Sequence, residues 1–107
     1  MPMVPTGFIN QTHIANEVSR AILKLGPEVV RVKHSVGEDT GGDPAIYFRI
    51  VLTDAASRKE TLANVTEDIA TILINELRPL ENWGLFPYFG FRSESEQATR
   101  SGDVKWA

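Results

Sequence analysis

Cations alternate with aromatic residues on one side of three segments that have the pattern of β-strands, residues 28–36, 45–53 and 85–93. Successive side chains of a strand point to opposite faces, so every second residue shares a face. Arginine and tyrosine are common anchors of protein interfaces, and exposed aromatic rings beside cations also suit single-stranded nucleic acids. We therefore predict a binding surface, called the open face below, made of Arg31, Lys33, Tyr47, Arg49, Phe86, Tyr88 and Arg92.

His34 suggests a third kind of site, in which acidic residues of loop 37–44 would add oxygen ligands for a metal ion. The predicted topology is similar to the cytoplasmic domain of cation diffusion facilitators. In that family a histidine ends the first strand, and further ligands lie on the second and third. Only His34 matches here, because Ile50 and the side chains of residues 89–91 cannot ligate a metal. The resemblance implies a shape, and neither zinc binding nor transport.

The chain has no recognisable catalytic motif. It contains no cysteine and no Gly-x-Ser-x-Gly, and loop 37–44 has neither the Gly-Lys-Ser/Thr ending of a phosphate loop nor the ligand spacing of a calcium loop. We therefore assign no catalytic residue, metal ligand or cofactor and expect a non-enzymatic protein.

Two amphipathic helices are predicted to cover the face opposite the open face. The first is expected to start after a cap at Asn10 or Thr12 and to stop at Gly26. The second is expected to start at a capping box formed by Ser57 and Glu60, and to end before Pro79. Their apolar stripes have helical spacing and comprise Ile14, Val18, Ala21, Ile22 and Leu25, then Leu62, Val65, Ile69, Ile72, Leu73 and Leu77.

The three strands should bury their other face under these helices. The order α-β-β-α-β makes the first two strands an antiparallel hairpin, and Pro87 favours an edge position for the third. The third strand can pair antiparallel with the first or parallel with the second, and we favour the first arrangement. We therefore predict an α+β two-layer sandwich, a three-stranded and mainly antiparallel sheet with two helices on one face. The residues predicted to face the core are Val30, Val32, His34, Val36, Ile46, Phe48, Ile50, Leu52, Leu85, Phe89 and Phe91.

A chain of 107 residues is long enough for one hydrophobic core. We predict one α+β domain over residues 1–93 and a polar C-terminal tail over residues 94–107. Trp106 is the exception within this tail, and if the tail folds over the open face the binding hypothesis loses much of its basis. We expect a cytoplasmic protein, because cysteine, a secretory signal and a membrane-spanning apolar run are all absent.

The sequence favours a small protein-interaction module that acts as a homodimer or an accessory subunit through the open face. A single-stranded nucleic-acid-binding domain is the first alternative, although the net charge of −3 argues against a role built on phosphate contacts. A metal-sensing or enzymatic site near His34 is the second alternative. Residues 41–49 and 91–97 resemble runs in small bacterial proteins of unknown function, and this resemblance implies no activity.

Overall fold

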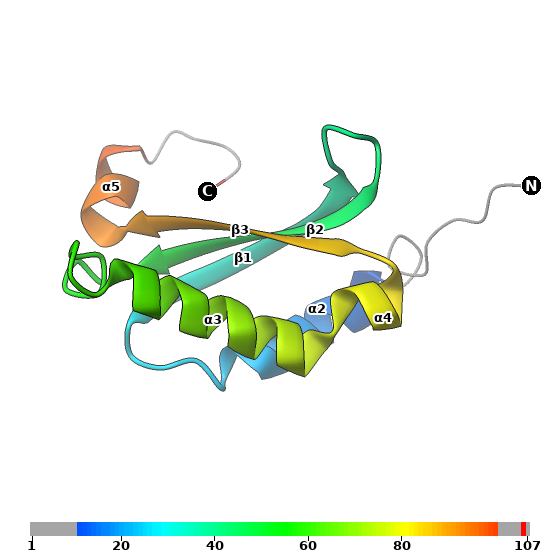
Figure 1. Cartoon of the computed structure of the whole chain (residues 1–107), viewed down its shortest axis with the longest axis horizontal. Helices are drawn as coiled ribbons and strands as arrows, with labels where there is room; N and C mark the ends of the chain where they lie inside the picture. Colours follow the sequence, from blue (N-terminus) through cyan, green and yellow to red (C-terminus); the bar gives the residue numbers. More distant parts are fainter. Residues whose placement is uncertain (1–10, 101–105, 107) are drawn as a thin grey trace, which may run out of the picture.

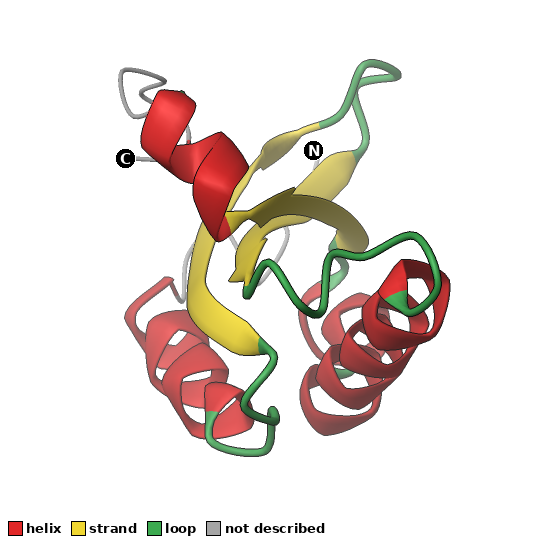
Figure 2. Cartoon of the chain, turned by 90° about the vertical axis from the view of Figure 1, so that its left-hand side faces the viewer, coloured by secondary structure: helices red, strands yellow, loops and turns green. Residues whose placement is uncertain are grey.

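The fold is an α+β sandwich with the predicted order of its main elements, as seen in a computed structural model that describes residues 11–100 and 106. Figures 1 and 2 show α2 and α3 on one side of a three-stranded sheet and α5 on the other. The elements are α2 (Gln11–Ile22), β1 (Val29–Glu38), β2 (Pro44–Leu52), α3 (Leu62–Leu77), α4 (Pro79–Trp83), β3 (Phe86–Ser93) and α5 (Glu94–Thr99).

The sheet has the order β1-β2-β3, so our preferred strand arrangement was wrong. β1 pairs antiparallel with β2, whereas β3 pairs parallel with β2 after the crossover through α3. The physical reason is the burial of β2. Its core-facing side chains are almost inaccessible to water, and Ala45 and Val51 on its other face are buried as well. A strand that is apolar on both faces belongs in the centre of a sheet. The predicted edge position of β3, with Pro87, is confirmed.

A β-bulge at Val30 changes which side of β1 each valine occupies. Val29 pairs with Leu52 and Arg31 pairs with Val51, so two steps along β1 match one step along β2. The extra residue reverses the alternation of side chains at the start of the strand. Val29 therefore packs against the core, contrary to the predicted alternation, and Val30 is 51% exposed.

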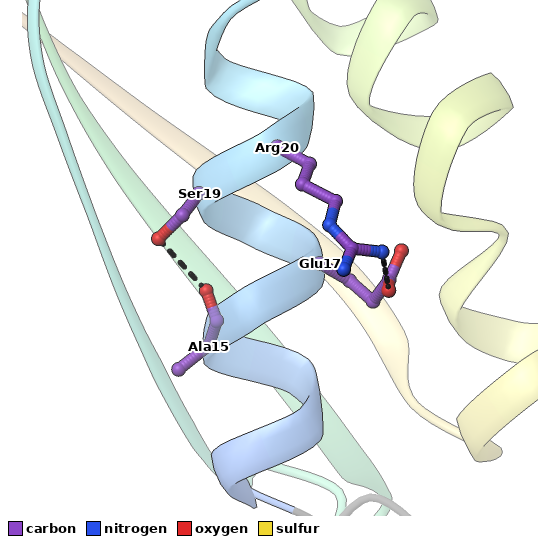
Figure 3. A network of polar contacts seen from close by, with 4 residues as sticks. All are labelled: Ala15, Glu17, Ser19 and Arg20. Atoms are coloured by element: carbon purple, nitrogen blue, oxygen red, sulfur yellow. Dashed lines mark hydrogen bonds and ion pairs between the residues drawn. The ribbon is translucent and has the colours of Figure 1, made fainter.

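Helix α2 buries Ile14, Val18 and Ala21 and turns a polar side to solvent (Figure 3). On one flank of this helix Ser19 Oγ donates to the Ala15 carbonyl at 3.0 Å, and the pair Arg20–Glu17 lies on the other flank. Arg20 and Glu17 form an ion pair at 2.9 Å, and exposed pairs of this kind contribute little to stability. The helix ends at Ile22, one turn before the predicted stop. The predicted Asn10 cap lies outside the described residues.

The predicted capping box at Ser57 does not form, and α3 begins only at Leu62. The amide and hydroxyl of Ser57 both donate to the Thr53 carbonyl, so this serine closes a turn after β2 instead of capping a helix. A true capping box occurs at Ser93, where the predicted polar tail was to begin. Its hydroxyl accepts from the Glu96 amide, and the Glu96 carboxylate accepts from the Ser93 amide. Residues 94–99 of that predicted tail therefore form α5.

The core lies between the sheet and the helices α2 and α3. Phe48 on β2 is 1% exposed and stacks on Phe89 of β3 with ring centroids 5.3 Å apart. Leu73 and Leu85 are fully buried beside them. Within residues 11–100, no helix combines the length and apolarity that a bilayer crossing requires.

We expect Phe48→Ala to lower the free energy of unfolding by about 3–5 kcal/mol, since it removes a fully buried ring and leaves a cavity. The matched control is Phe86→Ala, because Phe86 is 42% exposed and should cost less than half as much. Urea unfolding followed by circular dichroism measures both changes. Equal losses for the two variants would contradict the location of the core.

Candidate functional site

The strand register gathers the predicted open-face residues into neighbouring rows across the sheet. One row joins Tyr47 to Tyr88, and the next joins Lys33 to Arg49 and Gly90. A third row joins Arg31, Val51 and Arg92. Phe86 begins β3, one row beyond Tyr88. All the predicted residues therefore lie in adjoining rows of one surface, although their environments differ.

Trp106 covers the part of the open face that contains Arg31 and Arg92. The Arg92 guanidinium lies 4.2 Å from the centroid of the indole, a cation–π distance. The Trp106 carbonyl accepts hydrogen bonds from Arg31 Nη2 at 2.6 Å and from Gln97 Nε2 at 3.2 Å. Two predicted binding cations are thus engaged within the chain.

Helix α5 covers the same end of the open face, contrary to the prediction of a sheet face without a helix. Asp54, which follows β2, holds the start of this helix. Its carboxylate accepts from the Ser95 hydroxyl at 2.7 Å and from the Ser95 amide at 3.0 Å. These bonds lower the pKa of the Asp54 carboxyl, the hydroxyl having the larger effect. Val51, below this end, is only 3% exposed.

The uncovered part of the open face is built around two stacked tyrosines. The rings of Tyr47 and Tyr88 lie 5.5 Å apart at an angle of 21°. Both hydroxyls donate to the β1–β2 hairpin: Tyr47 to the Glu38 carbonyl and Tyr88 to Asp39 Oδ2, each at 2.8 Å. Phe86 and Tyr88 are each 42% exposed. The tyrosines therefore present a fixed aromatic surface to solvent.

Two cations adjoin this aromatic surface. Arg49 Nη1 donates to Ser35 Oγ at 2.9 Å, and its guanidinium carbon lies 5.9 Å from the centroid of the Tyr47 ring. Lys33, the register partner of Arg49 on β1, is exposed. Lys33, Tyr47, Arg49, Phe86 and Tyr88 are called the uncovered patch below.

Asp39 organises the hairpin beside the patch, and the sequence analysis had not singled it out for this role. Its Oδ1 accepts from the amides of Gly41 and Asp43, each at 2.9 Å, in addition to the Tyr88 bond. The Tyr88 hydroxyl is the main cause that lowers the pKa of the Asp39 carboxyl, and the same bond raises the pKa of Tyr88. The feature of the sequence that could have indicated this role is an aspartate in a loop, two residues before a glycine.

Gly90 is the other functional residue that sequence reasoning missed. A Cβ built at this position would lie 3.2 Å from Cζ2 of the Trp106 indole. A glycine inside a strand often marks the close approach of another group, so its position in the strand could have indicated this role from the sequence. The absence of a side chain at Gly90 therefore lets the indole lie on the sheet.

His34 lies on the helix side of the sheet, opposite Phe48, and is half-buried. Burial lowers the pKa of its imidazole, which favours the neutral ring. Over the part of the chain that the structure describes, no three histidine, aspartate or glutamate side chains are grouped so as to hold a metal ion. The Asp54 carboxylate bonds to the Ser95 hydroxyl, and the Asp39 carboxylate bonds to the Tyr88 hydroxyl. Among the described residues, neither histidine is hydrogen-bonded to either pair.

Comparisons of the chain with protein-family models, with curated proteins and with solved structures found no match. The geometry of the open face is therefore the basis on which a function can be assigned.

We expect Tyr88→Phe to raise the pKa of the Asp39 carboxyl, because it removes the hydrogen bond that does most to lower that pKa. In the unfolded protein the pKa of an aspartate is about 3.9, and in the folded protein the pKa of Asp39 is lower, so its ionised carboxylate stabilises the fold above about pH 3.9. This stabilisation is lost as the pH falls through the pKa of Asp39 in the folded protein. Tyr88→Phe should therefore reduce the loss of stability between pH 7 and pH 3. Carboxyl NMR titration measures the pKa directly. Tyr47→Phe is the control, since that hydroxyl bonds to Glu38, and the same rise in both variants would refute the assignment.

We also expect Gly90→Val to displace the indole of Trp106, because the new side chain would occupy the space directly beneath it. Acrylamide should then quench the tryptophan fluorescence more strongly, since the other tryptophan, Trp83, stays 4% exposed. Gly37→Val is the matched control, a strand glycine whose added Cβ would meet no atom of the described residues within 4 Å. Unchanged quenching in Gly90→Val would contradict this role.

Proposed function

We propose that this protein is a non-enzymatic interaction module that binds another protein chain, a second copy or a different protein, through the uncovered patch. The observation that carries the proposal is the joint presence of exposed aromatic rings and cations on a sheet face. Phe86 and Tyr88 are substantially exposed, and Lys33 and Arg49 adjoin the stacked tyrosines. Aromatic and arginine side chains are the residues that most often anchor protein interfaces.

The edges of the sheet support a role for its face, because both edge strands carry features that discourage pairing with another strand. β1 has the bulge at Val30 and the exposed charge of Lys33. β3 carries Pro87, which has no amide hydrogen to donate. Bulges, lysine and proline are the usual devices that protect sheet edges from edge-to-edge association.

The nucleic-acid alternative has weaker support from the same surface. Bases bind by stacking on open ring faces, and Tyr47 and Tyr88 each have one ring face occupied by the other. The Asp39 carboxylate lies 2.8 Å from the Tyr88 hydroxyl, where it would repel a phosphate. Arg31 and Arg92, which would follow a phosphate backbone, both contact Trp106.

We further propose that the protein works in the cytoplasm. A chain without cysteine needs no oxidising compartment for its fold, which fits this assignment.

Site-specific photocrosslinking in cells that naturally produce the protein tests the proposed interaction. A benzophenone side chain at position 86 should give a discrete adduct, whose mass identifies a second copy or another protein. The control is the same group at position 23, because Leu23 is 83% exposed but lies just after α2, away from the patch. We expect no such adduct there.

Arg49→Glu should abolish the adduct formed at position 86, whereas Arg20→Glu on the exposed side of α2 should leave it unchanged. The proposal fails if position 86 gives no adduct above background. It also fails if positions 23 and 86 capture the same proteins.

A further inference from the structure

A small cavity lies on the open face between the stacked tyrosines and Trp106. Its volume is about 220 Å³, and its lining includes Tyr47, Arg49, Tyr88, Gly90 and Trp106. The remaining lining residues, Phe48 and Phe89, belong to the core side of their strands and stack on each other there. Pockets for whole drug-sized ligands measure about 300–1,000 Å³, so this cavity suits a single side chain.

The lining of the cavity favours a flat aromatic guest. Two tyrosine rings and the indole of Trp106 line it, and the edge of the indole lies over Gly90. Aromatic rings attract one another in offset-stacked and edge-to-face arrangements, which aliphatic side chains cannot reproduce.

At the end of the cavity near Arg49, away from the Asp39 carboxylate that borders Tyr88, the charges favour an acidic group next to that ring. Arg49 lines the cavity, and its register partner Lys33 is exposed beside it. A guanidinium has five N–H donors, of which the hydrogen bond to Ser35 uses one. Carboxylates next to the guest ring would pair with these cations, whereas a cationic guest would be repelled.

Trp106 shows that the open face already holds one aromatic residue of this kind. Its ring lies against Arg92 and Gly90, and its backbone carbonyl accepts from Arg31 and Gln97. In the neighbouring row, Arg49 can take the place of these arginines, lying beside an aromatic ring and donating to an acceptor oxygen.

We infer that the cavity between Trp106 and the tyrosine pair is the anchor site for one aromatic side chain of a partner protein, carried on a segment with an acidic residue next to it that pairs with Arg49. This inference rests on the proposed function and names the chemistry of the partner.

Peptide titrations of the full ¹⁵N-labelled chain, followed by NMR at low salt, test the inference. The probe is the acetylated pentapeptide amide EEYEE, and the controls are EEAEE and KKYKK. EEYEE should shift the amide of Gly90 and the indole N–H of Trp106 in a saturable way. EEAEE should bind at least about tenfold more weakly because it lacks the ring, and KKYKK should give no saturable shift.

Arg49→Gln should weaken the binding of EEYEE by about tenfold, since it removes the charge from the hydrogen bonds to the peptide carboxylates. The matched control Arg20→Gln, on the exposed side of α2, should bind EEYEE as the natural protein does.

The inference is overturned by the absence of a saturable shift with EEYEE, by equal affinity for EEYEE and EEAEE, or by saturable binding of KKYKK. Shifts of the same residues by the single-stranded oligonucleotide decathymidylate would overturn it as well. Shifts of these signals with protein concentration alone would also overturn it, because a second copy would then be the occupant. Adducts at position 86 without binding of EEYEE would retain the interaction module and reject the aromatic anchor.

Discussion

The parallel register between β2 and β3 is the constraint on which both the core and the candidate surface depend. It sets Phe48 beside Phe89 on the helix side and Tyr47 beside Tyr88 on the open side, and both pairs stack. It also sets Arg49 beside Gly90, where the strand has no side chain. A shift of one residue would exchange the two faces of β3, placing tyrosine in the core and phenylalanine in water. Burial of the phenylalanines therefore fixes the arrangement of the surface.

Side-chain alternation and helical spacing were sufficient to predict the architecture. The stripes of α2 and α3, apart from the exposed Leu62, follow from apolar periodicity, as does the core face of β2. The edge position of β3 follows from one proline. The position of β3 in the sheet did not follow, because pairing with either neighbour buries the same face of the strand. What decides it is the burial of Ala45 and Val51, small and β-branched residues whose pattern alone does not reveal a second buried face. The bulge at Val30 was also hidden, since the adjacent residues Val29 and Val30 are both valine and either one fits the core face.

The surface was predicted in outline, and its division into two parts was not. Alternation placed the seven cationic and aromatic residues on one face, but it could not show that Arg31 and Arg92 contact Trp106. That contact depends on Gly90 and on α5, which starts at a capping box within an apparently polar tail. Serine and glutamate in the same spacing after β2 form no capping box, because Ser57 instead donates to the Thr53 carbonyl just beyond the strand. Whether this four-residue motif caps a helix thus depends on the end of the strand that precedes it.

The tyrosine pair joins two strands that are 41 positions apart in the sequence, as the register partners Tyr47 and Tyr88 show. The β1–β2 hairpin can form through local contacts, but the pairing of β2 with β3 requires the intervening α3 and α4 to be in place, and distant contacts of this kind form slowly. Tyr47 on an isolated hairpin would lack its stacking partner, and Asp39 would lack its tyrosine donor. The aromatic surface therefore exists only on the completed fold, and incompletely folded chains would lack it.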